Sequence, residues 1–327
     1  MKIAITGAGG MIGRKLANRL ALDGKIGDQE ISGLWLHDAV ACPSIAEAQV
    51  PIETIAGDLT DPRQVQQLLD CRPDVIFHLA AVVSGEAERD FDKGYRVNLD
   101  ATRQLLETVR KLAYCPRFIF ASSVAVFGAP LPNPIPDSQY LTPLTSYGTQ
   151  KAICELLISD YSRRGMIDGL ALRLPTICVR PGKPNAAASG FFSSIIREPL
   201  AGLEAQLPVS DDVQHWHASP RTAVGFLMHA AQLDTSALGA SRAITLPGVA
   251  VTVGQQIAAL QRVAGDEAVQ LIRRNSDATI QQIVAGWPQS FQPTRALALG
   301  FRAESSFDEI IQVYLEDDAP EAGASKG

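Results

Sequence analysis

Short apolar runs rich in β-branched residues alternate with longer segments of helical period through the first half of the chain. A short apolar run bounded by turn residues predicts a strand, whereas apolar positions three and four apart predict a helix. We expect strands at residues 2–6, 34–37, 53–55, 74–79, 117–121 and 169–174, and helices at residues 11–23, 63–69, 90–112 and 147–164. Strands that alternate with helices form a parallel sheet with helices on both faces. The pattern therefore predicts an α/β domain with a doubly wound parallel sheet over residues 1–179.

The alternation becomes less regular after about residue 180. A stretch with Pro181, Gly182 and Pro184 predicts a loop, and helical patterns follow at residues 191–199, 222–232, 255–264, 280–285 and 308–315. We expect residues 180–318 to form a smaller, mostly helical lobe at the carboxyl ends of the strands, with some elements returning to the first domain. Residues 319–327 are small and lack an apolar period, which predicts a flexible tail, and the acidic run at 316–318 is interpreted as solvated.

Composition narrows the class of protein. Apolar residues make up 46% of the 327 residues and charged residues 20%, which is typical of a globular protein with an ample core. A net charge of −6 argues against nucleic acid and anionic membrane as partners, because both select clusters of Lys and Arg. The sequence shows no signal peptide and no apolar run near the ~20 residues of a membrane span. Five scattered cysteines without a CxxC pair indicate free thiols, so we expect a cytoplasmic protein without a disulfide framework or metal site.

The first predicted strand leads directly into a glycine-rich loop, which reads Gly7-Ala8-Gly9-Gly10-Met11-Ile12-Gly13. Glycines at 7, 10 and 13 allow a tight turn, close approach of the backbone to a pyrophosphate, and close packing of the next helix on the sheet. The helix amino terminus at Met11 and Ile12 then offers free N–H groups and the positive end of its dipole to phosphates. The arrangement predicts a Rossmann-type dinucleotide site, and the alternative is a merely tight turn.

The second predicted strand ends at Asp38, the position at which an acidic residue meets the adenosine ribose. A carboxylate there accepts a hydrogen bond from the 2′-hydroxyl and repels a 2′-phosphate. Ala39 and Val40 follow, so no arginine stands beside Asp38 to accept a phosphate. The sequence therefore predicts NAD rather than NADP as the cofactor. Asp58 and Leu59 suit the adenine edge, although Asp58 could instead cap the helix before Pro62.

Candidate catalytic residues lie at the end of the fifth predicted strand and at the start of the helix at 147–164. Tyr147 and Lys151 are four apart, which puts the phenol and the ammonium on one helix face. A phenol with a pKa near 10 is a weak base at neutral pH, and a nearby ammonium favours its ionised form. A serine hydroxyl of Ser122-Ser123 could hold the substrate oxygen beside Tyr147. This set predicts hydride transfer from carbon to the cofactor and proton transfer from oxygen to tyrosine.

Five stretches together resemble the extended short-chain dehydrogenases/reductases, the group of the nucleotide-sugar epimerases. They are the glycine loop, residues 78–81 (His-Leu-Ala-Ala), Asn98, residues 122–128 (Ser-Ser-Val-Ala-Val-Phe-Gly) and residues 147–151 (Tyr-Gly-Thr-Gln-Lys), and the resemblance extends over nearly the whole chain. It implies that the catalytic hydroxyl belongs to Ser123, which stands four residues before the aromatic Phe127.

The same resemblance implies further contacts with the cofactor. Ala80 and Ala81 would line it, and Pro175 and Thr176 would flank the nicotinamide. Tyr147 and Lys151 would contact it too, Lys151 through the ribose hydroxyls. Asn98 would support the site.

The second half departs from the pattern of the nucleotide-sugar enzymes. Those epimerases carry an Arg-Asp-aromatic-x-His-Val-Asp-Asp stretch that grips the nucleotide diphosphate, whereas residues 214–221 here read Gln-His-Trp-His-Ala-Ser-Pro-Arg. Residues 180–185, 189–193 and 215–221 instead resemble the branch that oxidises the C2 hydroxyl of a four-carbon sugar acid, D-erythronate, with NAD. The resemblance therefore implies NAD-dependent oxidation of a small sugar acid, with Tyr147 as the general base.

A substrate carboxylate needs a fork of donors, which an arginine matches in bidentate fashion. The candidates are Arg180 and Arg221, and the alternative for each is a structural or surface ion pair. His215 and His217 could pass for a metal pair, but no third ligand is evident, and a polar pocket lining is favoured. The remaining expected substrate contacts are Ser84, Ser123, Tyr147, Thr176 and Asn185.

Three other functions stay open at this point. They are a nucleotide-sugar epimerase or dehydratase, a dehydrogenase of another small substrate such as an amino-alcohol acid, and a cofactor-sensing protein without turnover. Net formation of NADH separates a dehydrogenase from an epimerase. The helices at 90–112 and 147–164 resemble those that pair across the dimer interface of relatives, so we also expect a homodimer.

Overall fold

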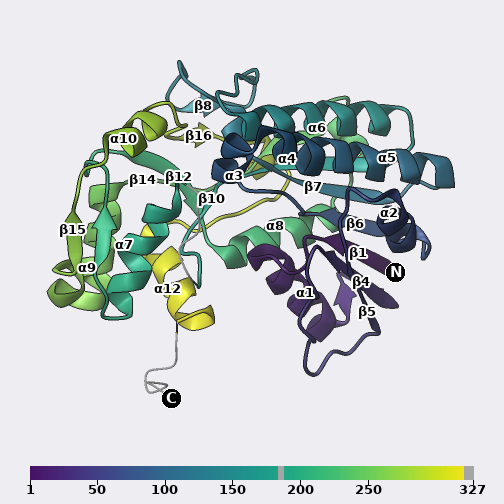
Figure 1. The fold of residues 1–327 in the computed structure, drawn as a ribbon, viewed down its shortest axis with the longest axis horizontal. Coiled ribbons are helices and arrows are strands. Elements are labelled where there is room, and N and C mark those ends of the chain that lie inside the picture. Colours follow the sequence, from purple (N-terminus) through teal and green to yellow (C-terminus); the bar gives the residue numbers. More distant parts are fainter. Residues whose placement is uncertain (183–187, 320–327) are drawn as a thin grey trace.

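A seven-stranded parallel sheet forms the centre of the computed structural model, which describes residues 1–182 and 188–319. The strand order is β13-β9-β7-β6-β1-β4-β5 (Figure 1). The strands are β1 (Lys2–Thr6), β4 (Gly33–Asp38), β5 (Ile52–Ala56), β6 (Val75–His78), β7 (Arg117–Ser123), β9 (Asp168–Leu174) and β13 (Ala243–Thr245). The chain runs outward from β1 to β5 and then crosses back to β6. The reversal of strand order between β1 and β6 is where open α/β sheets bind ligands.

Helices cover both faces of this sheet. On one face α1 (Met11–Asp23) packs against α8 (Pro220–Gln232), and on the other lie α2 (Pro62–Leu69), α5 (Ala101–Leu112) and α6 (Ser146–Arg163) (Figure 1). The central strands are apolar on both sides, as buried parallel strands must be. In β1, Ile3 and Ile5 belong to the core under α1 and α8, whereas Ala4 belongs to the core under α2, α5 and α6.

A smaller lobe has a core of its own, to which Phe192, Ile195, Leu260 and Ile310 contribute. Its helices are α7 (Gly190–Leu200), α9 (Val253–Val269), α10 (Ala278–Ala285) and α12 (Phe307–Asp317). Figure 1 shows the lobe on the left, away from the N-terminus where β1 begins. Among the described residues, no helix is both long enough and apolar enough to cross a membrane.

Short elements complete the chain. One small sheet joins β10 (Thr176–Ile177), β12 (Gln214–Ala218) and β14 (Val249–Thr252). Two strand pairs are β11 (Ala205–Leu207) with β15 (Ile272–Arg274), and β16 (Phe291–Gln292) with β8 (Ile135–Pro136). A third pair joins β2 (Lys25–Ile26) and β3 (Gln29–Glu30). The remaining helical pieces are α3 (Ser84–Arg89), α11 (Thr294–Ala298) and 3₁₀ turns at Val124–Val126 and Ser236–Leu238.

The structure differs from the sequence expectations in one helical region. The helix expected at 90–112 consists of α4 (Phe91–Gly94), a π-helical turn (Tyr95–Asp100) and α5. A π turn inserts an extra residue into the helical repeat and is common at functional sites. In contrast, α8 and β13 come from the second half of the chain and pack on the main sheet, in line with the expectation that some elements return to the first domain. The division into residues 1–179 and 180–318 remains a prediction.

The acidic run at 316–318 is solvated in part: Glu316 and Asp317 are exposed, whereas Asp318 departs from the sequence interpretation. Asp318 pairs with Lys15 of α1 at 2.7 Å, and its side chain is only 10% exposed. Glu316 and Asp317 both pair with Arg221 of α8. The end of α12 is therefore held against two helices of the sheet domain, because it meets two cations there. The expected flexible tail from residue 320 onward lies outside the described residues.

Candidate active site

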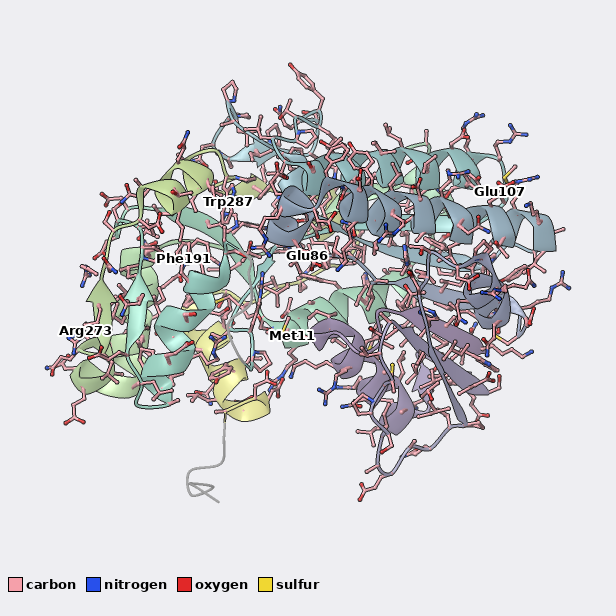
Figure 2. All side chains as sticks on the ribbon, in the orientation of Figure 1. Met11, Glu86, Glu107, Phe191, Arg273 and Trp287 are labelled. Carbon is pink, nitrogen blue, oxygen red and sulfur yellow. The ribbon has the colours of Figure 1, made fainter. Side chains whose placement is uncertain are left out.

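The glycine loop closes tightly between β1 and α1. Gly7 has a φ of +73°, and a Cβ there would lie 2.6 Å from the backbone nitrogen of Ala80. A Cβ at Gly13 would lie 2.1 Å from the carbonyl oxygen of Gly7, so neither position accepts a side chain. α1 begins after Gly10 without a side-chain cap, which leaves its amino terminus for a negatively charged ligand. Figure 2 shows Met11, the first residue of α1, between the sheet and the lobe. The loop fits the pyrophosphate of a dinucleotide.

Asp38 stands at the end of β4, directly beside this loop. Its Oδ2 accepts a hydrogen bond from the backbone nitrogen of Gly9 at 2.9 Å. A Cβ at Gly9 would lie 3.1 Å from the Asp38 carboxyl, so the close approach depends on glycine. The bond holds the carboxylate at the mouth of the loop, which suits the adenosine ribose of NAD.

The loop after β5 resolves one open alternative. Asp58 is exposed, and its Oδ1 accepts from the backbone nitrogen of Thr60 at 2.9 Å. The cap of α2 is Asp61, whose carboxylate accepts from the nitrogen of Arg63. Asp58 is therefore not the helix cap, and the neighbouring Leu59 is buried.

The three predicted catalytic side chains meet where β7 ends and α6 begins. Ser123 is the last residue of β7, and its hydroxyl lies close enough to the phenol of Tyr147 to lower the pKa of that phenol. Lys151 lies one turn further along α6, with Nζ 5.5 Å from the centroid of the Tyr147 ring. Gly148 makes this possible, because a Cβ there would lie 2.2 Å from the carbonyl oxygen of Ala125. The glycine lets α6 press against the end of β7.

The residues that influence the pKa of Tyr147 differ from the one that the sequence spacing predicts. Burial raises the pKa of the Tyr147 phenol, and the Arg180 guanidinium and the Ser123 hydroxyl act in the opposite direction. Lys151 was expected to lower the pKa of Tyr147, but its ammonium donates to the carbonyl oxygen of Ala121 at 2.8 Å. The net shift in this structure is upward, because desolvation of the phenolate outweighs the nearby positive charge.

Lys151 is itself a buried cation, with an exposed fraction of 2%. Burial lowers the pKa of its ammonium to about 8, while Cys154 and Glu155 act to raise it. Nζ lies 4.5 Å from the centroid of the Phe120 ring, a distance that suits a cation–π contact. The pKa of this ammonium beside the tyrosine therefore lies close to neutral pH.

Of the two candidate arginines, Arg180 lies near the catalytic tyrosine. Its Nε donates to the carbonyl oxygen of Ile177 at 3.0 Å, and one terminal nitrogen donates to the Ser189 hydroxyl at 3.3 Å. Its backbone nitrogen donates to the Ser193 hydroxyl at 3.0 Å. These contacts fix the guanidinium close enough to Tyr147 to act on the pKa of the phenol. Asn185, the other residue expected in this segment, lies outside the described residues.

Arg221 has different surroundings. It is held at the start of α8 by Glu316 and Asp317, and nearly half of its side chain is exposed. Its positive charge is already balanced by two carboxylates of the same chain. The ion-pair alternative therefore fits Arg221, and Arg180 is the arginine that the fold brings to Tyr147.

Thr176 is tied to a buried histidine pair. The Nδ1 of His215 contacts the carbonyl oxygen of Pro288 at 2.7 Å, so it must carry the proton, and Nε2 accepts from the Thr176 hydroxyl at 2.7 Å. Nε2 of His217 contacts the Gln256 amide at 3.0 Å. Both rings are less than 4% exposed, so they support the pocket rather than line it. Burial lowers the pKa of both, that of His215 to about 4. Within the described residues, no group of three or more His, Cys, Asp or Glu could hold a metal ion.

The remaining expected residues lie around the same strand ends. Ser84 begins α3, and Pro175 separates β9 from β10. The Asn98 side chain is buried and bonded to both backbone groups of Val82, so it supports the loop that contains Ala80 and Ala81.

Sequence reasoning missed several polar residues of the site. Ser189 binds Arg180, and Gln150, next to Lys151, accepts from the Asn98 amide at 2.7 Å. Glu155 lies one turn beyond Lys151 and is paired with Arg173 at 2.8 Å. Gln150 and Glu155 could have been found from the sequence, because their spacing from Tyr147 along the predicted helix is recognisable. No feature of the sequence around Ser189 indicated its contact with Arg180.

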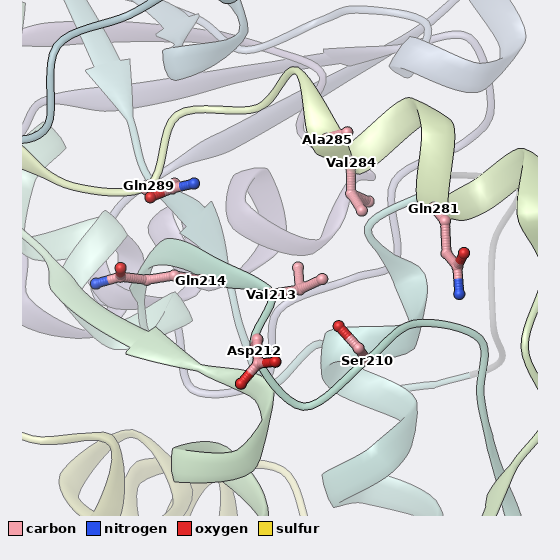
Figure 3. A pocket seen from close by; sticks show the side chains of 8 residues that line it. All are labelled: Ser210, Asp212, Val213, Gln214, Gln281, Val284, Ala285 and Gln289. Atoms are coloured by element: carbon pink, nitrogen blue, oxygen red, sulfur yellow. The ribbon is translucent and has the colours of Figure 1, made fainter.

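A separate hollow of about 400 Å³ lies on the lobe (Figure 3). None of the predicted site residues lines it. Its lining residues are Ser210, Asp212, Val213, Gln214, Gln281, Val284, Ala285 and Gln289.

Comparison with known proteins places the chain in a family. A model of the NAD dependent epimerase/dehydratase family matches residues 3–218. The chain is 50% identical over 323 residues to the D-erythronate dehydrogenase of Cupriavidus necator, which covers 97% of this chain and 98% of that protein. It is 46% identical over 318 residues to the D-erythronate dehydrogenase of Haemophilus influenzae, covering 97% and 100%.

Solved structures agree on the fold. A crystal structure described as the nucleoside-diphosphate-sugar epimerase from Agrobacterium tumefaciens is 57% identical, with a TM-score of 0.95 over 99% of this chain and 95% of that one. The GalE-like L-threonine dehydrogenase from Cupriavidus necator superposes with a TM-score of 0.82 over 97% of this chain and 99% of that one. It is 22% identical, so this likeness concerns the fold alone.

Proposed function

The chain belongs to the NAD-dependent epimerase/dehydratase family, and from this premise we propose that it oxidises a small sugar acid with NAD, with D-erythronate as the substrate and C2 as the oxidised carbon. Two relatives named D-erythronate dehydrogenase, 50% and 46% identical over nearly their whole length, support this substrate. The enzyme is thus a dehydrogenase acting on a CH–OH group. Gly7, Gly13 and Asp38 would hold the dinucleotide.

The observation that carries the proposal is that the buried Arg180 guanidinium lies close enough to Tyr147 for its charge to lower the pKa of the phenol. In a 2-hydroxy acid the carboxylate and the reacting hydroxyl are attached to neighbouring carbons. A base for the hydroxyl and a cation for the carboxylate must therefore lie in the same site, and the charge of Arg180 does act on the phenol of Tyr147. Arg221, paired with Glu316 and Asp317, offers no such arrangement.

The side chains divide the reaction between them. The Ser123 hydroxyl holds the C2 oxygen of the substrate, and ionised Tyr147 takes the proton from that oxygen. Bound NAD would accept the hydride that leaves C2. Arg180 supplies positive charge that favours the phenolate. Thr176, whose hydroxyl proton is directed to His215, presents an acceptor to a substrate hydroxyl.

A second function is supported by one finding. The Agrobacterium tumefaciens relative, 57% identical, is described as a nucleoside-diphosphate-sugar epimerase. An epimerase returns the hydride to its substrate, whereas a dehydrogenase leaves it on the cofactor.

Parallel assays with NAD separate the two functions. Purified protein would receive D-erythronate, D-threonate, L-threonine or a UDP-sugar, and both NADH absorbance and product would be followed. We expect steady NADH formation with D-erythronate alone. Interconversion of a UDP-sugar without net NADH, and no NADH with any acid, would replace the proposal with the epimerase function.

The two arginines provide a matched pair of variants. Arg180→Met should raise the KM for D-erythronate about 10- to 100-fold, because hydrogen bonds to a charged group contribute about 1.5–3 kcal/mol. Arg221→Met is the same substitution at an arginine that is paired with Glu316 and Asp317, and it should leave that KM unchanged. A normal KM in Arg180→Met would show that the carboxylate binds elsewhere.

We also propose a homodimer that pairs α5 and α6 across a two-fold axis. Phe91 and Leu156, at 56% and 69% exposure, leave an apolar face on this side of the molecule, and the ring of Tyr95 extends it, with its centroid 4.4 Å from that of Phe91. Leu156→Glu should convert the protein to a monomer in light scattering, whereas Leu203→Glu, at a similarly exposed position on the lobe, should not. A dimer that survives Leu156→Glu would contradict the arrangement.

For the cellular location we propose the cytoplasm. All five cysteines are free thiols, which supports a reducing compartment.

A further inference from the structure

A chain of hydrogen bonds lies beneath the cofactor loop, formed by Thr6, His78, Thr102 and Asn98. All four residues are at most 1% exposed. Thr6 and His78 are register partners at the ends of the neighbouring strands β1 and β6, so their side chains lie on the same face of the sheet. Thr102 and Asn98 come from α5 and the π-helical turn before it. We call these four residues the buried polar chain.

The direction of every hydrogen bond in the buried polar chain can be deduced. The Thr102 hydroxyl donates its single proton to the carbonyl oxygen of Asn98 at 2.7 Å. At 2.8 Å from His78 Nε2 it must therefore accept, which puts the proton of the imidazole on Nε2. The other ring nitrogen, Nδ1, then accepts from the Thr6 hydroxyl at 2.6 Å. Burial lowers the pKa of His78 to about 3, so the ring is neutral, as this pattern requires.

Both ends of the buried polar chain hold the loop after β6. The backbone nitrogen of Ala80 contacts the Thr6 hydroxyl at 3.4 Å, and Ala80 is the residue against which Gly7 packs. Two residues later, Val82 is bonded through its nitrogen to the Asn98 side chain at 2.8 Å and through its oxygen at 3.2 Å. The loop that faces the glycine-rich turn is therefore fastened at two points.

The buried polar chain also reaches the catalytic helix. The Asn98 amide donates to Gln150, the neighbour of Lys151 on α6, at 2.7 Å. The Cys154 thiol of the same helix donates to the Asn98 carbonyl oxygen at 3.3 Å. Hydrogen bonds of one consistent set of directions thus link the strand before the glycine loop, the loop at residues 80–82 and the helix that carries Tyr147 and Lys151.

We propose that His78 is a positioning residue of the dehydrogenase, whose Nε2–H tautomer sets the place of the cofactor loop relative to the catalytic helix. The ring acts through Thr6, Thr102 and Asn98. Because a hydroxyl of defined direction stands on each side, reversing the tautomer would put two protons or two lone pairs face to face. This inference rests on the proposed function, because NAD is the ligand that the loop would hold.

A purely structural role is the alternative, since His78 also packs on Phe118 and Phe120 with ring centroids 5.9 and 5.7 Å away. Packing would be preserved in Thr102→Val, which keeps the shape of the side chain and removes its hydroxyl. Thr102→Ser keeps the hydroxyl. Thr108→Val is the matched control, because Thr108 is a buried threonine of α5 whose hydroxyl bonds only to Gln104 one turn before it.

The test measures NADH binding by fluorescence titration at a temperature at which every variant is folded. Thr102→Val should weaken NADH binding about tenfold, the size of one lost buried hydrogen bond. Thr102→Ser and Thr108→Val should bind as the wild type does. Equal binding by Thr102→Val and the wild type would overturn the proposal, whereas failure of the wild type itself to bind NADH would overturn the proposed function instead.

Nitrogen-15 spectra of the wild-type histidine side chains provide a measurement that needs no variant. The signals of His78 should show a neutral ring protonated at Nε2 from pH 5 to 8, with Nδ1 as a strong acceptor. A ring protonated at Nδ1, or an equal mixture of tautomers, would contradict the deduced bond directions and the role built on them.

Discussion

At Tyr147 two opposing effects act on one phenol. Burial raises its pKa, and Arg180 and Ser123 lower it, with a net upward shift. The tyrosine is therefore protonated near neutral pH in this structure, and the positively charged nicotinamide ring of bound NAD would favour its ionised form, which suits a base that must act only on a bound substrate. Lys151, with a pKa of about 8, is the second ionisable group at this position.

Removing the phenol oxygen isolates its role. Tyr147→Phe should lower kcat by about 10²- to 10⁴-fold, the usual contribution of a general base, and leave NADH binding nearly unchanged. Tyr140→Phe is the control, because Tyr140 is 78% exposed and should affect neither quantity. Steady-state rates and fluorescence titration measure the two effects. Turnover retained in Tyr147→Phe would exclude the proposed base.

The proximity of Ser123, Tyr147 and Lys151 could be predicted, because they follow a strand end and a helix start at recognisable spacings, and their catalytic roles stay a proposal. The choice between Arg180 and Arg221 could not be predicted. The two arginines differ through partners far away in the chain, and the carboxylates that bind Arg221 lie about 95 residues later. No local pattern reports such a pair.

At the scale of elements, α6 is tied to the sheet by a buried ion pair. Glu155 accepts from the Ser122 hydroxyl at 2.5 Å and from Arg173 of β9 at 2.8 Å. The side chains of Glu155 and Arg173 are 3% and 11% exposed. Ser122 precedes the catalytic Ser123, so the pair aligns the end of β7 with the helix that carries Tyr147.

Glu155→Gln should therefore destabilise the fold. Breaking a buried pair leaves the charge of Arg173 uncompensated, and we expect a loss of about 3–5 kcal/mol in the free energy of unfolding. Glu107→Gln removes a partly exposed pair with Arg110 and should cost about 1 kcal/mol or less. Urea denaturation measures both. Similar small losses in the two variants would argue that Glu155 is not needed to balance Arg173.

The elements of the first half agree closely with those expected from the sequence, because each is long enough to show its period. β1 and α1 have the expected bounds, and α6 differs by one residue at each end. The strands of the lobe were not expected, since β10, β12 and β14 are two to five residues long and depend on one another for pairing. The π-helical turn at 95–100 carries no sequence signal either.

At the scale of the molecule, four buried histidines (His37, His78, His215 and His217) couple stability to pH, because burial lowers the pKa of each. Burial lowers the pKa of His78 to about 3 and that of His215 to about 4, and it also lowers the pKa of His217 well below its usual value. In the unfolded chain each titrates near 6.5. Below that pH the unfolded chain binds more protons than the folded one, so stability is full above about pH 6.5 and falls as the pH decreases.

The melting temperature should therefore decrease between pH 7.5 and pH 5.5, before carboxylates begin to titrate. Each histidine contributes up to about 1.4 kcal/mol per pH unit below 6.5. His215→Gln removes one of the four and should make this slope shallower. Calorimetry across this range measures it, and a constant melting temperature would show that the rings are not held neutral.

The central claim is that the hydride leaves C2 of a sugar acid and stays on the cofactor. D-Erythronate labelled with deuterium at C2, mixed with the enzyme and NAD, tests it in one experiment. We expect NADH that carries the deuterium, formed in equal amount with a 2-keto acid, as mass spectrometry of both products would show. Unlabelled NADH would contradict the position of oxidation, and an absence of NADH would contradict the dehydrogenase itself.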